Sequence, residues 1–294
     1  MASIRILKRR IKTSKNIAKI TRAMEMVAAS KMKRAQDQAL AGKLYSEELA
    51  KVLDRLARRI SQDLHPLLTG GNPNGQVGVL LLSTDKGLCG GLNTNLFFKL
   101  EKIIAENKNT NVLEHKIKVI SVGKKARDYV ARMGYELWAS FINLGDIPTS
   151  IDARPIAKLI TETFINFELS EVWIVFPGFV STLVQEARAV KLLPLGTLDV
   201  LEDDTYDVAS DYLFEPKANI ILDQLLPYYI ENRIYQLLLE TRASEQSARM
   251  VAMKNARESA NDLAGDLTLT YNRIRQSRIT NELLDATSSR LALG

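Results

Sequence analysis

The two ends of the chain carry its longest helical patterns. Residues 3–60 contain no proline and a single glycine, Gly42, among residues that favour helix. Their apolar side chains recur at spacings of three and four, which predicts one apolar helical face formed by Ile4, Leu7, Ile11, Ile17, Ile20, Met24 and Val27. A helix of this span is roughly 80 Å long, and such a length without internal caps is typical of a coiled coil. We therefore expect a partner helix.

The C-terminal part of the chain supplies that partner. Pro216 is well placed to open a helix, and the pattern runs from Ala218 to about Leu291. Pro227 should kink this helix or start it afresh. Its predicted apolar face consists of Ile230, Ile234, Leu237, Thr241, Ala248, Val251, Ala252, Leu263, Leu267 and Ile274.

Small side chains and methionines are expected to fill the seam between the two helices. Small residues allow two helix backbones to approach closely, and methionine fills irregular gaps. The small residues are Ala23, Ala28, Ala29, Ala243, Ser244, Ser247, Ala248, Ala252 and Ala256, and the methionines are Met24, Met26, Met32, Met250 and Met253.

Between the two ends the pattern changes to alternating strands and helices. Compact β-branched runs predict strands over 77–83, 118–122 and 171–176, and helical patterns cover 92–107, 124–133 and 151–167. Asp152 is a plausible helix cap. Pro177 and Gly178 should turn the chain into residues 181–193, which could return as an antiparallel edge strand. The predicted fold class is α/β: a coiled coil and a central Rossmann-like domain with a mostly parallel sheet.

These patterns divide the chain into three parts. We expect an N-terminal coiled-coil helix over residues 1–65, a central α/β domain over 76–205 and a C-terminal coiled-coil helix over 212–294. The acidic stretch 199–211 reads as a linker. Its Asp203, Asp204 and Asp207 could hold a cation, but such a run is more often a solvated charge cluster.

Composition adds one asymmetry. The 294 residues are 46% hydrophobic and 25% charged, which is typical of a globular protein. Residues 1–34 hold eleven Lys and Arg against Glu25, a net charge of +10, so the rest of the chain carries −4 of the total of +6. The basic arm therefore predicts an acidic protein partner, a nucleic acid or an anionic membrane surface. The arm contains no aromatic residue, which argues against RNA and membrane binding.

The chain offers little catalytic chemistry. Cys89 is the only cysteine, so no intrachain disulfide can form. The two histidines, His65 and His115, lie in unrelated segments. The glycine-rich loop 83–93 follows a strand and precedes a helix, as phosphate-binding loops do, but matches neither the dinucleotide nor the P-loop motif. We interpret its glycines as a tight crossover and expect no catalytic residue, cofactor or metal.

Three segments resemble the signature stretches of the gamma subunits of F-type ATP synthases. They are Ala23-Met24-Glu25-Met26-Val27-Ala28-Ala29-Ser30-Lys31-Met32, the loop 83–93, and Ala243-Ser244-Glu245-Gln246-Ser247-Ala248-Arg249-Met250-Val251-Ala252-Met253-Lys254. The resemblance extends over nearly the whole chain. It implies that the terminal helices form an antiparallel coiled coil, which passes through a ring of three alpha and three beta subunits.

The resemblance also implies partners and contact residues. The α/β domain would bind the epsilon subunit and the membrane c-ring, and the basic arm would meet acidic loops of the beta subunits. The expected contacts with the catalytic ring are Arg9, Arg10, Met24, Lys31, Arg242, Gln246 and Arg249. Tyr212 and Glu215 are expected on the side of the c-ring and epsilon.

The implied function is that of a rotary shaft without chemistry of its own, peripheral on the cytoplasmic face of a bacterial plasma membrane. The N-terminus shows neither a secretory signal nor an evident transit peptide, which favours a bacterial source. Two alternatives stay open: a small nucleotide-binding α/β protein with coiled-coil arms, and a nucleic-acid-binding protein that uses its basic arm.

Overall fold

The protein forms two compact units. A computed structural model describes residues 2–59, 65–109, 117–195 and 218–292. Residues 1–29 and 249–294 form one unit, which we call the coil unit, and residues 30–248 form the other, which we call the α/β unit. Two long helices, α1 (Ala2–Arg59) and α6 (Ala218–Ala292), contribute to both units, and their bounds confirm the predicted terminal helices. The three-part division stays a prediction, and Tyr212, Glu215 and Pro216 lie outside the described residues.

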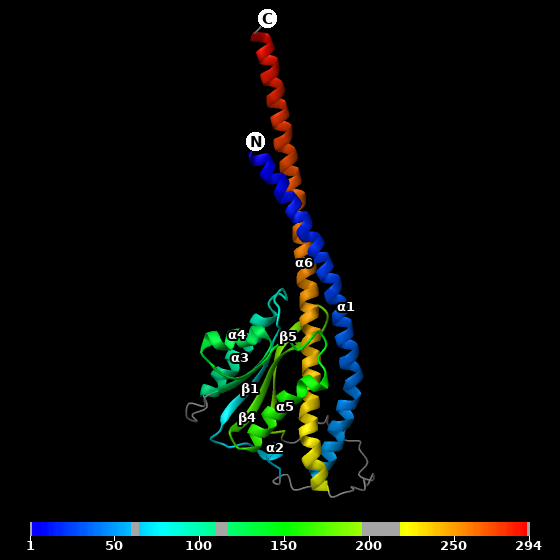
Figure 1. Ribbon diagram of the computed structural model, residues 1–294, viewed down its shortest axis with the longest axis vertical. Helices are drawn as coiled ribbons and strands as arrows, with labels where there is room; N and C mark the ends of the chain where they lie inside the picture. Colours follow the sequence, from blue (N-terminus) through cyan, green and yellow to red (C-terminus); the bar gives the residue numbers. More distant parts are fainter. Residues whose placement is uncertain (1, 60–64, 110–116, 196–217, 293–294) are drawn as a thin grey trace. The chain divides into compact units, whose positions relative to one another are not determined.

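The coil unit is a pair of antiparallel helices with a regular seam. Figure 1 shows α1 and α6 running in opposite directions, with α6 continuing past the N-terminus of α1. Buried and half-buried positions alternate at spacings of three and four on both helices, which is the 3.5-residue period of a coiled coil. On α1 they are Ile4, Leu7, Ile11, Ser14, Ala18, Thr21, Glu25 and Ala28; on α6 they are Met250, Met253, Arg257, Ala260, Ala264, Leu267, Tyr271 and Ile274.

The predicted membership of this seam is partly wrong. Ile17, Ile20 and Val27 are 45–59% exposed, because they lie one position away from the 3.5-residue register. Small and polar side chains take the seam positions instead, among them Ser14 and Ala18. The other residues wrongly assigned to the seam, all of them exposed, are Ala23, Met26 and Leu263.

The α/β unit contains one five-stranded sheet. The strands are β1 (Gln76–Leu82), β2 (Ile117–Val122), β3 (Glu136–Phe141), β4 (Leu169–Phe179) and β5 (Gln185–Leu193), in the order β3-β2-β1-β4-β5. The first four strands pair in parallel and β5 pairs antiparallel to β4, which confirms the mostly parallel sheet and the returning edge strand.

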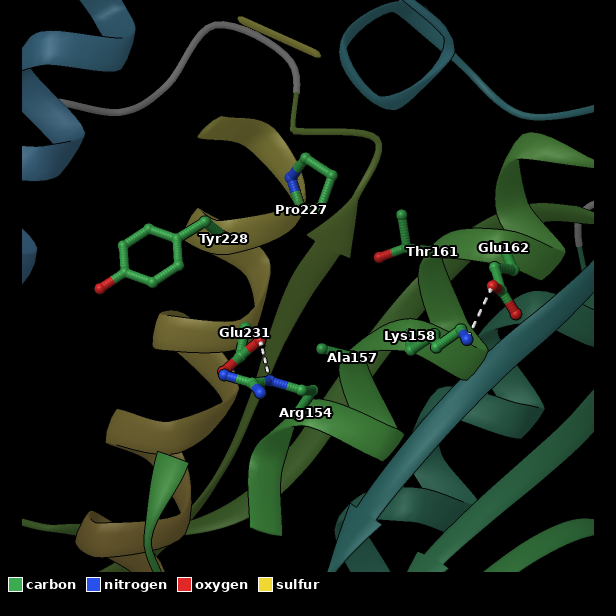
Figure 2. A pocket seen from close by; sticks show the side chains of 8 residues that line it. All are labelled: Arg154, Ala157, Lys158, Thr161, Glu162, Pro227, Tyr228 and Glu231. Atoms are coloured by element: carbon green, nitrogen blue, oxygen red, sulfur yellow. Dashed lines mark hydrogen bonds and ion pairs between the residues drawn. The ribbon is translucent and has the colours of Figure 1, made fainter. Parts of the chain in front are cut away.

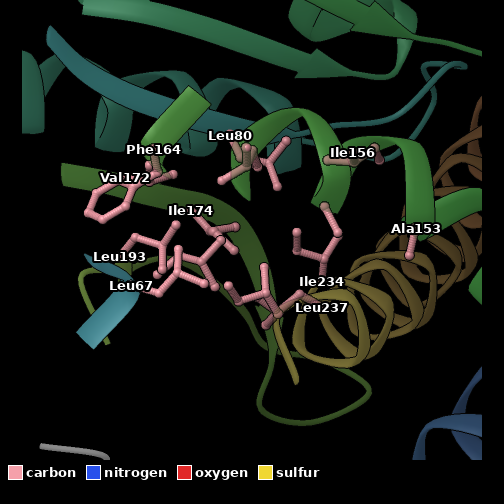
Figure 3. Close-up of a cluster of buried hydrophobic side chains, with 14 of the residues drawn as sticks. Leu67, Leu80, Ala153, Ile156, Phe164, Val172, Ile174, Leu193, Ile234 and Leu237 are labelled. Atoms are coloured by element: carbon pink, nitrogen blue, oxygen red, sulfur yellow. The ribbon is translucent and has the colours of Figure 1, made fainter. Parts of the chain in front are cut away.

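Helices cover both faces of this sheet. Helices α3 (Leu92–Asn109) and α4 (Lys124–Met133) lie on one face, and α5 (Ser150–Ile165) lies with α6 on the other (Figure 1). A short helix, α2 (Pro66–Thr69), precedes β1. In Figure 3, side chains from the sheet, from α5 and from α6 meet in one apolar cluster, among them Ile174, Phe164 and Ile234. The first part of α6 is thus a core element of the α/β unit.

Three local expectations need correction. Pro177 and Gly178 lie inside β4, and the chain turns at residues 180–184 instead. Asp152 is not the N-cap itself but the N3 residue of a capping box whose N-cap is Thr149. Pro227 lies inside α6, which does not start afresh there. Strand β3 was not predicted at all.

Candidate functional site

The carboxyl edge of the sheet is where a doubly wound fold normally holds a ligand. Strand β1 lies between β2 and β4, so the strand order reverses there, and ligands of such sheets bind outside the carboxyl ends of the strands at that point. The glycine-rich loop follows β1 at this edge. In this chain, α6 lies at that edge. The backbone amide of Phe179, at the end of β4, donates to the Glu240 carboxylate at 3.0 Å. The Asp85 carboxylate, just beyond β1, lies 3.6 Å from the Arg242 guanidinium group.

The glycine-rich loop is held as a compact crossover. The Asn93 side-chain amide donates to the Thr84 hydroxyl at 2.9 Å, which joins the two ends of the loop. Gly90 has a φ of +59°, a left-handed conformation that glycine adopts without steric cost, and Leu88 takes a φ of +64° and is exposed. These features agree with the interpretation of the loop as a tight strand-to-helix connection.

A second glycine at this edge allows a close approach between backbones. Gly123 has a φ of +91°, and a side chain there would lie 2.6 Å from the carbonyl oxygen of Ser83. The Ser83 hydroxyl also accepts a hydrogen bond of 2.7 Å from the amide of Ala126, in the first turn of α4. The ends of β1 and β2 are thereby fixed to the start of α4.

The residues predicted to contact a catalytic ring fall into two groups. Arg9 and Arg10 are exposed and Met24 is half-buried, all on α1 in the coil unit. Lys31 donates a 2.7 Å hydrogen bond to Asp146, and this ammonium group lowers the pKa of that carboxyl.

The second group lies on α6, where the side chains are nearly inaccessible. Arg242 and Arg249 are each 9% exposed and Gln246 is 5% exposed. Arg242 makes its contacts within the α/β unit. The ring contacts of all seven residues stay a prediction, as do those of Tyr212 and Glu215, which lie outside the described residues.

Sequence reasoning missed an apolar outer surface on the coil unit. Ile6, Ile17, Ile20, Met26 and Val27 are 45–59% exposed on α1, among the exposed cations of the same helix. Their apolar character was visible in the sequence, but Ile17, Ile20, Met26 and Val27 were assigned to the seam, and Ile6 was assigned to neither surface.

A shallow groove separates α5 from α6 in the α/β unit. It has a volume of 390 Å³, and Arg154, Thr161 and Tyr228 are among the side chains around it (Figure 2). Two ion pairs cross or flank it, Arg154–Glu231 at 3.4 Å and Lys158–Glu162 at 3.6 Å. Arg154 and Lys158 are mostly exposed, so these pairs are loosely held.

One carboxylate joins α3 to the α4 region on the far face of the sheet. Glu101 accepts hydrogen bonds of 2.8 Å from both Tyr129 and Tyr135. Burial, followed by these bonds, raises the pKa of each tyrosine to about 12. The ring of Tyr129 stacks on that of Phe97, with 4.0 Å between the ring centroids. Both tyrosines therefore stay neutral donors at physiological pH, which suits a structural brace.

The described residues contain neither a cluster of metal ligands nor a membrane-spanning helix. No group of three or more metal-ligating side chains gathers within the ranges that the structure describes. No helix within those ranges is long and apolar enough to cross a membrane.

Comparison with known proteins identifies the family. The family model described as ATP synthase matches residues 3–293. The chain is 44% identical to the ATP synthase gamma chain of Dehalococcoides mccartyi over 297 residues, covering 100% of both chains. It is 40% identical to that of Herpetosiphon aurantiacus over 300 residues, covering 100% of this chain and 99% of the other.

Solved structures show the same fold. One is a chain of the mitochondrial ATP synthase of Euglena gracilis, with a TM-score of 0.67, 20% identity and coverage of 99% of this chain and 95% of that one. A chain of the central stalk and c-ring structure from Tetrahymena thermophila has a TM-score of 0.61 and 23% identity, covering 81% of this chain and 99% of that one. The family match, the full-length relatives and the shared fold together place this chain in the ATP synthase gamma-chain family.

Proposed function

We propose that this chain is the central rotary shaft of a proton-translocating F-type ATP synthase and that it catalyses no reaction itself. Its partners would be three alpha and three beta subunits, the epsilon subunit and a membrane c-ring. It would lie peripherally on the cytoplasmic face of a bacterial plasma membrane. One observation carries the proposal: relatives named ATP synthase gamma chain match the full length of this chain, including both long helices and the α/β unit.

The mechanism would be coupling through contact. Two antiparallel helices have no threefold symmetry, so a coiled coil inside a threefold ring touches each beta subunit differently. An element shifts a neighbour's conformational equilibrium only through such differences in contact free energy. Rotation would then pass each beta subunit through the same series of conformations in turn.

The exposed surface of α1 suits such contacts. Arg9 and Arg10 are exposed cations, and Ile17 and Ile20 are exposed apolar residues on the same helix. A basic surface with apolar residues fits acidic loops that also bring apolar side chains. We propose that these residues, with Met24 and Lys31, carry the contacts of α1 with the ring.

Composition of the complex is the first test. Native mass spectrometry of the complex that copurifies with this chain, combined with an ATPase assay, should find one copy with three each of two larger, ATP-hydrolysing subunits. A monomer or homodimer with its own bound nucleotide would favour the nucleotide-binding alternative. Salt-sensitive, stoichiometric binding to DNA or RNA would favour the nucleic-acid alternative.

Charge reversal tests the electrostatic part. Arg9→Glu with Arg10→Glu should weaken coupling between ATP hydrolysis and proton pumping in the assembled complex. The matched control reverses two exposed lysines of the α/β unit, Lys102 and Lys158, and should leave coupling as in the wild type. Unchanged coupling in the Arg9 and Arg10 variant would remove the electrostatic contribution.

A further inference from the structure

The segment of α6 that leaves the α/β unit is buried all round and rich in polar side chains. Every residue from 241 to 248 is buried, although an ordinary surface helix buries one stripe. Thr241 opens the segment, and five of the seven residues after it also have polar side chains: Arg242, Ser244, Glu245, Gln246 and Ser247. Earlier in α6, the buried side chains are apolar, among them Leu226, Ile230 and Ile234. The buried side chains of α6 therefore change from apolar to polar where the helix leaves the α/β unit.

Arg242 lies at the centre of this segment. Its guanidinium group donates to Glu245 at 2.7 Å and to the carbonyl oxygen of Leu144 at 3.0 Å, and it lies 3.6 Å from the Asp85 carboxylate. The side chains of Arg242, Asp85 and Glu245 are 10%, 15% and 3% exposed. We call Asp85, Arg242, Glu245 and the Leu144 carbonyl the latch.

Asp85 joins the latch to the loops at the carboxyl edge of the sheet. While one of its oxygens faces Arg242, the other accepts a 3.1 Å hydrogen bond from the amide of Lys124, at the start of α4. The same oxygen accepts a 3.4 Å bond from the amide of Asn143, in the loop after β3. One carboxylate therefore connects the ends of β1, β2 and β3 to α6.

Further hydrogen bonds hold the same stretch of α6 from the β4–β5 side. The amide of Phe179 donates to Glu240 at 3.0 Å. The Ser247 hydroxyl donates to the carbonyl oxygen of Thr182 at 2.6 Å. The side-chain amide of Gln185 donates to that hydroxyl at 3.3 Å. Bonds thus reach this part of α6 from the carboxyl ends of β1, β3 and β4.

Hydrogen bonds restrict the orientation of a helix more narrowly than apolar packing does. Burial of leucine and isoleucine is non-directional, whereas the planar guanidinium fork of Arg242, with two hydrogen-bond acceptors and one ion-pair partner, adds orientational specificity. Buried polar groups are best attested as devices that fix register. We infer that the latch fixes the rotational position of α6 about its own axis relative to the α/β unit.

This inference rests on the proposed function and gives the latch a role in it. If the α/β unit receives torque, α6 must carry that torque onward at a defined angle. Asp85 and Arg242 are then positioning residues: they keep the rotational angle of α6 within the α/β unit constant under load. Without the latch, α6 should take a wider range of rotational angles, and coupling should weaken. The loss should be largest in ATP synthesis, where torque enters through the α/β unit.

The test uses the intact complex in proteoliposomes, with Asp85→Asn, Arg242→Met and the double variant. Asp85→Asn keeps an oxygen for the Lys124 and Asn143 amides and removes the charge that faces Arg242. We expect the ratio of ATP synthesis to ATP hydrolysis to fall about tenfold in each single variant. The double variant should fall no further than Arg242→Met, because that change already removes the contact with Asp85. Arg242→Lys, which keeps the charge but not the fork, should be intermediate.

A direct readout separates positioning from stability. In single-molecule rotation of the complex, the pauses of the latch variants should be spread over a wider range of angles than those of the wild type. A merely structural role would lower the melting temperature without widening the pauses of assembled complexes. The matched control is Arg154→Met, which removes an exposed ion pair between α5 and α6 and should change neither quantity.

The outcomes are distinguishable. Unchanged pause angles and an unchanged synthesis ratio in Asp85→Asn would overturn the latch, while wild-type rotation would leave the proposed function standing. An effect of Arg242→Met that Asp85→Asn does not share would also overturn it, because the effect would then not depend on the contact between Arg242 and Asp85. If Arg242→Met fails to assemble, Asp85→Asn decides alone. Absence of rotation in the wild-type complex would contradict the proposed function itself.

Discussion

The two halves of α6 lie in opposite surroundings. Before residue 249, the helix is part of the core of the α/β unit, where Leu226, Ile230 and Ile234 are fully buried. In the coil unit, it buries mainly one seam of small or amphipathic residues, and residues 275–288 are all exposed. The first half of α6 is thus stabilised by the core of the α/β unit, whereas the second half gains little from burial within this chain. The coil unit therefore depends more on contacts outside this chain than the α/β unit, which has a core of its own.

Phe164→Ala should have the largest effect and tests the α/β half of the comparison. Phe164 on α5 is fully buried beneath the sheet, so the change should lower the free energy of unfolding by about 3–5 kcal/mol. Urea unfolding followed by the fluorescence of Trp138 and Trp173, both in the sheet, would measure it. The control Phe98→Ala removes a ring that is 69% exposed and should change stability by less than about 0.5 kcal/mol. Equal effects of the two changes would contradict the proposed core.

Glu25→Ala tests the seam of the coil unit. Glu25 lies 2.9 Å from Arg257 across the seam, as an ion pair without the alignment of a hydrogen bond, and both side chains are partly buried. Its loss should destabilise the pairing by about 1 kcal/mol, less than the core change. Amide hydrogen exchange over 250–265 should accelerate, while exchange in β1 stays unchanged. The exposed pair Arg278–Glu282 provides the control: Glu282→Ala should have a smaller effect.

Gly265→Ala should stabilise the coil unit. No atom lies within 4 Å of the position where its side chain would begin, so alanine gains helix propensity without a clash, about 0.5–1 kcal/mol. Gly42→Ala is the counterpart in the α/β unit, where the new methyl group would collide with Gln236 on the facing helix. Thermal unfolding by circular dichroism should show a gain for Gly265→Ala and little or no gain for Gly42→Ala. A larger gain at Gly42 would contradict the close approach of α1 and α6 there.

A pH dependence at His65 should be the smallest effect. Burial lowers the pKa of His65, and the nearby Asp223 carboxylate opposes this. The unfolded chain therefore takes up the proton first, so stability is complete above pH 6.5, the ordinary pKa, and declines as the pH falls below it. His65→Asn keeps the side-chain acceptor that caps α2 and should reduce this decline by no more than about 1 kcal/mol. Identical acid profiles of the variant and the wild type would contradict the burial effect.

The sequence determined the elements better than the contacts between them. Helix α4 was predicted with the bounds Lys124–Met133 that the structure shows, because glycines flank a strongly periodic segment. Strand β3 was missed, since Glu136–Phe141 is a half-exposed edge strand without a continuous β-branched run. The coiled-coil seam was misplaced because Ser14 and Ala18, which occupy it, carry no hydrophobic signal.

The latch could not be read from the sequence. Asp85, Leu144 and Arg242 come from three distant segments, and only the sheet order β3-β2-β1-β4-β5 brings the first two to one edge. Arg242 was singled out by its place in a motif and its charge, which predict a partner contact as readily as an internal one. Its burial, and hence its intrachain role, depends on the packing of α6 against the carboxyl edge.

Rotation is the most direct test of the central claim. The alpha and beta subunits of the purified complex would be fixed to a surface. A probe would be attached to the c-ring, or to the α/β unit through an introduced cysteine at the exposed Lys102, with the buried Cys89 left in place. On addition of ATP, we expect rotation in one direction with pauses related by threefold symmetry. A probe that fluctuates without net rotation, while the complex hydrolyses ATP, would contradict the account of this chain as a rotary shaft.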